Sequence, residues 1–211
     1  MKKMYSIPAV VLFLFVIGLV VTGCGGAKPQ SAENATAEKP MLIRLAHPGA
    51  PNHPWHIAAQ KFSETVTQRT NGKVKFEIYT AGQMGNEREM TESVQNGSLQ
   101  MSVQSTMTMS GFEPSLALLD LPYLFPNYDI AYKVLDGKIG EQFAKKLLPQ
   151  GLHVLSWLEN DYRCFSNSKK PIEKVEDLKG MKMRVPETPI LVAWMKDIGA
   201  LPTVIPYNEL Y

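Results

Sequence analysis

The hydrophobic and polar positions follow two different periods from about residue 41 onward, and each period predicts a type of secondary structure. Residues 73–79 alternate polar and apolar side chains with a period of two, which is typical of a strand. Residues 53–70 repeat apolar side chains every four positions and predict a helix that ends at Asn71-Gly72. The residues expected to form the core face of this helix are Ala58, Phe62 and Val66.

The same two periods predict the remaining elements of the chain. The expected strands are 43–46, 73–79, 99–103, 152–158, 181–185 and 203–205. The expected helices are 53–70, 87–95, 128–135, 138–148, 175–180 and 189–198. The apolar stretch 121–126 is expected to lie in the core, and a partner-binding surface is the alternative. Strands that alternate with helices predict an α/β fold with a mostly parallel sheet and right-handed crossovers.

The first 23 residues are expected to be an export signal rather than part of the fold. Lys2 and Lys3 supply a positive start, and the apolar run 7–21 is shorter than the roughly 20 residues that a membrane span needs. The run ends at Val-Thr-Gly-Cys, which resembles the lipobox of bacterial lipoproteins and marks Cys24 for lipidation. An ordinary signal peptide or an uncleaved anchor is the alternative. Residues 24–40 then lack large apolar side chains and predict a flexible tether.

Charge and cysteine content narrow the class of protein further. When Lys2 and Lys3 are set aside with the signal, the 22 Lys and Arg fall to 20, which balances the 20 Asp and Glu. No basic stripe interleaved with aromatic residues is found, so nucleic acid is not an expected partner. Cys24 and Cys164 are the two cysteines, and Cys164 is expected to be a small, partly buried residue rather than a nucleophile.

One arginine stands where an α/β protein binds ligands. Arg184 lies near the end of the predicted strand 181–185, just before Pro186 and a helix for which Thr188 is the expected N-cap. Ligands of α/β sheets bind at the carboxyl ends of the strands. Because a guanidinium grips a carboxylate with two parallel hydrogen bonds, Arg184 predicts capture of a small organic acid.

Six stretches together resemble the solute-binding proteins of tripartite ATP-independent periplasmic (TRAP) transporters, in the dicarboxylate-type branch. They are LAHPGAPNHPW, GQMGNEREMTESVQNGSLQM, LALLDLPYLF, RCFSNSKKPI, DLKGMKMRVPE and PYNELY. The resemblance spans residues 42–211 and implies a periplasmic-binding-protein-like α/β fold, with two lobes that close around a ligand. It places the first lobe at 41–158 and the start of the second at 159–211. The second lobe is expected to be incomplete, because the chain stops where Asn208 is expected to cap a new helix.

The resemblance also implies which side chains meet the ligand. Arg184 occupies the position of the family's carboxylate-binding arginine, and Arg163 resembles a second arginine that faces the cleft. From the first lobe, His47, Asn86 and Glu87 are implied as polar contacts. The remaining implied contacts are Gln104, Ser105, Thr106 and Tyr207.

The implied function is that of an extracytoplasmic receptor that captures a small organic anion and delivers it to TRAP permease subunits in the membrane. No cofactor, metal or catalytic residue is expected. A zinc site at His47, His53 and His56 is disfavoured because no acidic or cysteine partner is spaced with them. Two other classes stay open: a lipoprotein that reports to a sensor, and a surface-anchored hydrolase, for which no GxSxG or HExxH motif is found. C4-dicarboxylates, keto acids, sugar acids and aromatic acids all satisfy one arginine equally.

Overall fold

The first sheet is parallel, and its strands end at the same edge. A computed structural model describes residues 34–210. The sheet has the order β2-β1-β3, formed by β1 (Met41–Ala46), β2 (Val74–Tyr79) and β3 (Met101–Ser102). The predicted strands are confirmed, although β3 is shorter than expected. Side chains that follow β1 and β3 lie close together, because Val103 N donates to Ala46 O at 3.0 Å.

Two helices, α1 (Pro54–Arg69) and α2 (Glu87–Gln95), follow β1 and β2. The predicted core face of α1 is wrong by one position, because Ala58 and Phe62 are exposed whereas Trp55, Ala59 and Ser63 are buried. The buried set keeps the four-residue spacing, and the indole of Trp55 sets the rotation by donating to Glu159 O at 3.3 Å. The start of α2 is confirmed, with Asn86 in a capping box with Glu89.

A helical region of short elements follows β3. It consists of α3 (Thr106–Met109), the 3₁₀ helix η2 (Pro114–Asp120), α4 (Tyr128–Leu135), α5 (Lys138–Leu147) and the 3₁₀ helix η3 (Leu148–Gln150). Its core contains Met109, Leu116, Leu147 and Leu152. The prediction that 121–126 lies in the core is wrong, because Leu121 and Leu124 are exposed and Tyr123 is 96% exposed. A left-handed backbone at Tyr123 (φ 61°) turns this ring away from the protein.

The expected strand at 152–158 is not present in the part of the chain that the structure describes. Residues 152–167 form no helix or strand, since no neighbouring strand offers hydrogen bonds, and Leu155 and Leu158 are exposed. Side chains hold this connecting segment instead: the hydroxyls of Tyr128 and Tyr132 donate to the carboxylates of Asp161 and Glu159. Cys164 lies farther along the segment and is exposed, so its predicted partial burial is wrong.

The second sheet is a parallel pair covered by one helix. Its elements are the 3₁₀ helix η4 (Val175–Leu178), β4 (Lys182–Val185), α6 (Pro189–Asp197), β5 (Leu201–Val204) and the 3₁₀ helix η5 (Tyr207–Glu209). The core under α6 includes Met183, Val185, Leu191 and Met195. Pro206 rather than Asn208 occupies the N-cap of η5, so the predicted cap is wrong by two residues.

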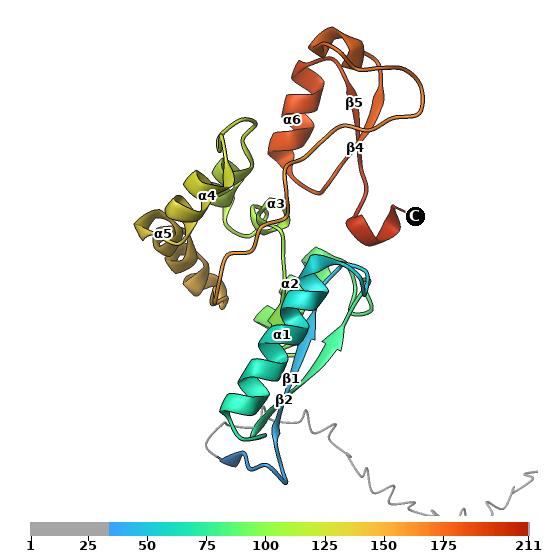
Figure 1. Cartoon of the computed structure of the whole chain (residues 1–211). Coiled ribbons are helices and arrows are strands. Elements are labelled where there is room, and N and C mark those ends of the chain that lie inside the picture. Colours follow the sequence, from blue (N-terminus) through green and yellow to red (C-terminus); the bar gives the residue numbers. More distant parts are fainter. Residues whose placement is uncertain (1–33, 211) are drawn as a thin grey trace, which may run out of the picture.

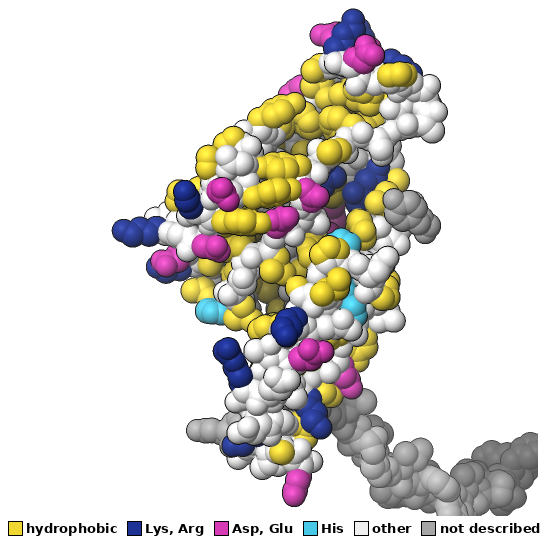
Figure 2. Space-filling model, in the orientation of Figure 1, with side chains coloured by type: hydrophobic (Ala, Val, Ile, Leu, Met, Phe, Trp, Pro, Cys, Tyr) yellow, Lys and Arg dark blue, Asp and Glu magenta, His cyan; other side chains and the backbone are white. Residues whose placement is uncertain are grey.

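The described chain therefore contains two regions built on separate sheets, joined by the helical region. The first lobe, with β1–β3, and the second lobe, with β4, β5 and α6, lie at opposite ends of the molecule, with α4 and α5 to one side (Figure 1). The final turn, η5, returns toward the first lobe, where the rings of Tyr207 and His53 lie 6.4 Å apart. Apolar side chains cover much of the middle of the face shown in Figure 2. No helix within residues 34–210 is long and apolar enough to cross a membrane.

Candidate ligand-binding site

A narrow crevice lies between the two lobes. Its first-lobe wall consists of Asn86, Glu87, Arg88 and Thr108, and its second-lobe wall of Arg184, Pro186, Glu187, Pro206 and Tyr207. Four of the predicted contacts, Asn86, Glu87, Arg184 and Tyr207, therefore share one crevice although they are far apart in the sequence. The cavity measures about 10 Å³, close to the room that one water needs. An organic acid can enter only if the lobes separate.

Arg184 is anchored by the sheet from which it projects. It lies one residue before the end of β4, and its Nε donates to the carbonyl of Ile205, just after β5, at 2.8 Å. This bond fixes the plane of a half-buried guanidinium. The second lobe thus holds an oriented cation in the crevice, which is the geometry that carboxylate recognition needs.

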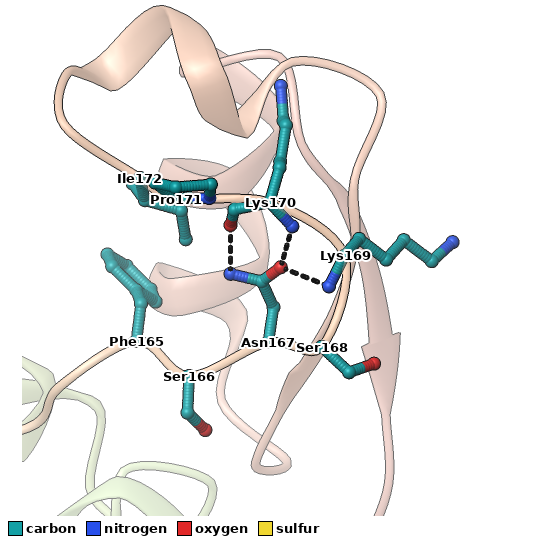
Figure 3. A pocket seen from close by; sticks show the side chains of 8 residues that line it. All are labelled: Phe165, Ser166, Asn167, Ser168, Lys169, Lys170, Pro171 and Ile172. Atoms are coloured by element: carbon teal, nitrogen blue, oxygen red, sulfur yellow. Dashed lines mark hydrogen bonds between the residues drawn. The ribbon is translucent and has the colours of Figure 1, made fainter.

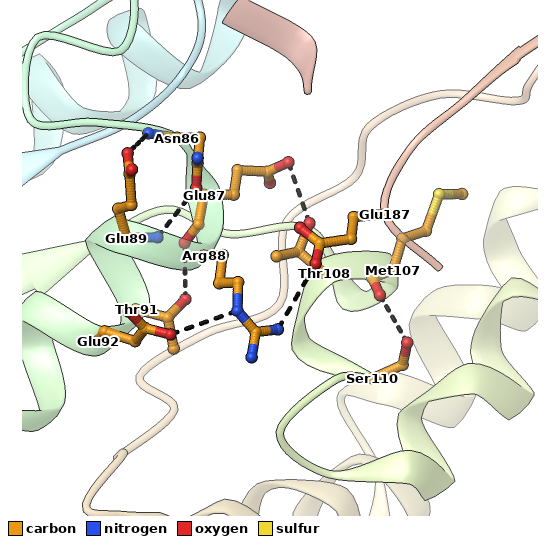
Figure 4. A network of polar contacts seen from close by, with 10 residues as sticks. All are labelled: Asn86, Glu87, Arg88, Glu89, Thr91, Glu92, Met107, Thr108, Ser110 and Glu187. Carbon is orange, nitrogen blue, oxygen red and sulfur yellow. Dashed lines mark hydrogen bonds and ion pairs between the residues drawn. The ribbon is translucent and has the colours of Figure 1, made fainter. Parts of the chain in front are cut away.

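Glu87 provides a negative charge on the opposite wall. As the first residue of α2 it lies where the helix dipole favours an anion. Its carboxylate accepts the Thr108 hydroxyl at 3.2 Å (Figure 4). It also accepts the Ser105 N–H at 2.8 Å, so Ser105 supports the site through its backbone. Burial raises the pKa of Glu87, while these two hydrogen bonds and the charge of Arg184 oppose the rise. Glu87 therefore already faces the arginine expected to bind the ligand.

An ion pair that sequence reasoning missed crosses the crevice. Arg88 on α2 lies 3.3 Å from Glu92 and 3.7 Å from Glu187 of the second lobe (Figure 4). Its guanidinium also lies 5.3 Å from the ring centre of Phe112. The Arg88 and Glu187 side chains are 45% and 52% exposed, so the pair contributes little to stability. Arg88 and Glu187 lie next to predicted contacts in the motifs, but their residue types alone gave no reason to pair them.

The other first-lobe contacts lie outside the crevice, at the carboxyl ends of the strands. His47 follows β1, is fully buried, and places Nε2 3.1 Å from Nδ1 of His56. Burial, and then the charges of His56 and His53, lower the pKa of His47 to about 4, so the ring is neutral near pH 7. Gln104 follows β3, and neither its Nε2 nor its Oε1 has a hydrogen-bond partner among the described residues.

Thr106 and Arg163 meet at a carboxylate that sequence reasoning also missed. The Thr106 hydroxyl donates to Asp120 Oδ1 at 2.8 Å. Burial raises the pKa of Asp120 to about 6, and the Thr106 bond and the charge of Arg163 oppose that rise. Arg163 itself places Nη2 3.2 Å from the sulfur of Met107. The signal in the sequence was the single charged residue inside the apolar run LALLDLPYLF.

A second, wider hollow is a feature of one turn rather than a binding site. It is lined by the consecutive residues 165–172, and Figure 3 shows Asn167 at its centre. The amide of Asn167 accepts the N–H groups of Lys169 and Lys170 and donates to the Lys170 carbonyl, which closes the turn. Both lysine side chains extend away from it. Within residues 34–210, no group of three or more His, Cys, Asp or Glu is placed to hold a metal ion.

The fold and crevice define a two-lobed α/β binding protein, and comparison with known proteins identifies its family. Residues 45–211 match the family of bacterial extracellular solute-binding proteins, family 7 (DctP), and the chain belongs to it. It is thus a relative of TRAP periplasmic solute-binding proteins, as the motifs predicted, and the family is one of binding proteins rather than enzymes.

Individual relatives are similar over most of this chain. The 2,3-diketo-L-gulonate-binding periplasmic protein YiaO of Escherichia coli is 32% identical over 206 residues, which are 98% of this chain and 60% of YiaO. A sugar acid binding protein of Advenella mimigardefordensis, solved with galactonate, superposes with a TM-score of 0.80 at 32% identity. The superposition covers 82% of this chain and 56% of the Advenella protein. A TRAP protein of Sulfurospirillum deleyianum, solved with succinate, has a TM-score of 0.77 at 32% identity, with 81% and 55% covered. The chain thus spans little more than half of each relative.

Proposed function

We propose that this protein is an extracytoplasmic receptor that captures a small organic acid and delivers it to the membrane subunits of a TRAP-type secondary transporter. The observation that carries the proposal is Arg184, which is oriented by Ile205 O and projects into the crevice between the lobes. Family membership and the periplasmic relatives support the transport role and the extracytoplasmic location. Two of the relatives were solved with galactonate and with succinate, both of which carry a carboxylate.

Binding requires a cycle of opening and closure. In the open form the ligand carboxylate pairs with Arg184, displacing the interaction of this guanidinium with Glu87. Arg163 and the polar groups of the first lobe, including His47, Gln104 and Thr106, contact the rest of the ligand. Closure excludes water from the ion pair and strengthens it, because the effective dielectric constant falls. Tyr207 closes over the ligand with η5.

The proposal also includes a lipid anchor and a lobe boundary. Cys24 lies outside the described residues, and its lipidation rests on the sequence motif. A lipid on Cys24, with residues 24–40 as tether, holds the receptor near its permease. The two lobes meet near residues 158 and 159 in this proposal. Mass spectrometry of the mature protein, compared with Cys24→Ser, tests the anchor: a mature chain without lipid in both proteins contradicts it.

Calorimetry of the full chain with a panel of mono- and dicarboxylates tests the function. At least one acid is expected to bind, and Arg184→Ala is expected to weaken it at least about 30-fold, because truncating one member of a buried ion pair costs about 2–5 kcal/mol. Arg69→Ala, at an exposed position in the last turn of α1, is the matched control and is expected to leave the affinity unchanged. Binding that survives Arg184→Ala undiminished would overturn the proposal.

A further inference from the structure

Several buried polar atoms of the first lobe have no hydrogen-bond partner among the described residues. Within residues 34–210, five buried side-chain nitrogen or oxygen atoms lack a hydrogen bond, and three of them are Nε2 and Oε1 of Gln104 and Oδ2 of Asp120. A buried polar atom without a partner costs about 1–3 kcal/mol, so native proteins retain few of them. Such atoms are expected where a ligand supplies the missing partners.

The two residues belong to one short stretch of polar structure. Gln104 directly follows Val103, whose N–H donates to the last residue of β1. Two positions later, the hydroxyl of Thr106 donates to the carboxylate of Asp120. The intervening Ser105 donates its N–H to Glu87, which lines the crevice. Residues 104–106 therefore connect Gln104 and Asp120 to Glu87, the residue of the first-lobe wall that faces Arg184.

The charges around this stretch are already balanced. Arg163 lies beside Asp120, and Arg184 lies near Glu87, so each arginine predicted to bind ligand faces a carboxylate. Arg88, a further cation on the crevice wall, is paired with Glu92 and Glu187. The neutral His47 adds no positive charge. A ligand with a second carboxylate at this end would have to compete with Asp120 for Arg163 and would be repelled by the charge of Asp120.

We propose that Gln104 and Asp120 form a hydroxyl-binding subsite, and that the ligand is a polyhydroxylated monocarboxylate rather than a dicarboxylate. This inference rests on the proposed function, because it takes Arg184 to bind the single carboxylate. A ligand hydroxyl donates to Asp120 Oδ2, and a neighbouring hydroxyl donates to Gln104 Oε1 and accepts from its Nε2. Relatives solved with galactonate and with succinate show that family membership alone leaves this choice open.

Two acids of equal chain length test the subsite. D-Erythronate has one carboxylate and three hydroxyls, whereas succinate has two carboxylates and no hydroxyl. Calorimetry of the full chain at pH 7.5, where Asp120 is ionised, is expected to show D-erythronate binding at least tenfold more tightly than succinate. Asp120→Asn removes the charge at nearly constant shape and is expected to shift the ratio of the two dissociation constants at least tenfold toward succinate. Asp197→Asn, the same change at an exposed site on α6, leaves the ratio unchanged.

A second variant protects the test against misfolding. Gln104→Leu removes the amide and is expected to weaken D-erythronate at least fivefold while leaving succinate unchanged. The subsite is refuted if the wild type prefers succinate, or if neither variant that folds changes the ratio. A wild type that binds no carboxylate in the panel overturns the proposed function as well, so the two failures are distinguishable.

Discussion

The two ends of the candidate site are built on opposite principles. At the second-lobe end, Arg184 is held by a carbonyl of the neighbouring strand, over a core that includes Met183 and Val185. At the first-lobe end, Gln104 and Asp120 hold buried polar atoms that nothing in the described chain satisfies. One end is therefore preorganised and internally satisfied, and the other is left unsatisfied.

In our proposal, the Arg184 end provides affinity for carboxylates, and the Gln104 and Asp120 end provides specificity among them. An oriented guanidinium recognises any carboxylate, so the Arg184 end favours organic acids as a class. A site that buries hydrogen-bonding groups rejects ligands that leave them unpaired, which makes the Gln104 and Asp120 end selective. In our proposal the Gln104 and Asp120 end distinguishes one organic acid from another, so substitutions at the two ends are expected to have different effects on ligand binding.

Among conservative substitutions in the site, Arg184→Lys is expected to weaken ligand binding most, because it keeps the charge but loses the planar fork and the bond to Ile205 O. Calorimetry is expected to show carboxylate binding about 10- to 100-fold weaker, or about 1.4–2.7 kcal/mol. Arg163→Lys serves as the comparison, and a smaller loss is expected because Arg163 lies beside the sulfur of Met107 and the charge of Asp120, with no strand carbonyl anchoring it among the described residues. Equal losses in the two variants would remove the distinction between an anchored and a supporting arginine.

The pH dependence of the unfolding free energy tests whether Asp120 is buried as an unfavourable charge. The pKa of Asp120 is about 6 in the folded protein against an ordinary value of 3.8. Between about pH 4 and 6 the folded state thus retains a proton that the unfolded chain has lost, so this group lowers stability as pH rises, by on the order of 2–3 kcal/mol. His47, with its pKa lowered from 6.5 to about 4, acts in the opposite direction, because the unfolded chain holds the extra proton over most of this window.

Asp120→Asn removes one of these two opposing contributions. Chemical denaturation at several pH values is expected to show that the variant gains stability relative to the wild type as pH rises from 4 to 6. Asp197→Asn, at an exposed position, is the control and is expected to follow the wild-type profile. Curves for Asp120→Asn and the wild type that stay parallel across this range would show that Asp120 is not buried as an unfavourable charge.

The contact between the lobes is expected to give a smaller effect. Gly82 has a left-handed backbone (φ +71°), and an added Cβ would lie 2.9 Å from Cβ of Asn208 in the second lobe. Gly97 has a similar φ of +78° but no atom within 4 Å, so Gly97→Ala measures the backbone strain alone, about 1 kcal/mol. Thermal unfolding is expected to show Gly82→Ala about 1–2 kcal/mol less stable than Gly97→Ala, since overpacking adds to strain. Identical melts would mean that η5 does not dock on the first lobe in solution.

The smallest expected change in unfolding free energy comes from the N-cap residues of α2 and α6. Asn86 accepts the N–H of Glu89 at 3.0 Å, so Asn86→Ala is expected to cost about 1 kcal/mol of unfolding free energy. Thr188 occupies the N-cap of α6 but makes no capping bond, and its buried hydroxyl has no partner among the described residues. Thr188→Val is therefore expected to be neutral or slightly stabilising in the same denaturation assay. A loss of 1 kcal/mol at Thr188 would reveal a bond that forms in solution.

Local signals in the sequence predicted most of the fold. The bounds of α2 and α4 matched, because Asn86 and Asn127 cap them with their own side chains and the apolar period begins directly afterwards. The errors occurred where a residue distant in the sequence determines whether a strand forms or which face of a helix is buried. Residues 152–158 are apolar enough for a strand but have none beside them, and the burial of α1 is set by Trp55 and its bond to Glu159.

By itself, then, the sequence determined the α/β class, the family and the arginine expected to hold a carboxylate, because these depend on short motifs and on the spacing of neighbouring residues. Only the tertiary structure revealed that Glu87 faces Arg184 and that Arg88 pairs with Glu187 across the crevice. It also revealed that Oδ2 of Asp120 and both side-chain polar atoms of Gln104 lack partners within residues 34–210. The physical reason is that burial and pairing arise between segments that meet in space. A charged residue in an apolar run signals that a partner is needed, but the run does not contain that partner.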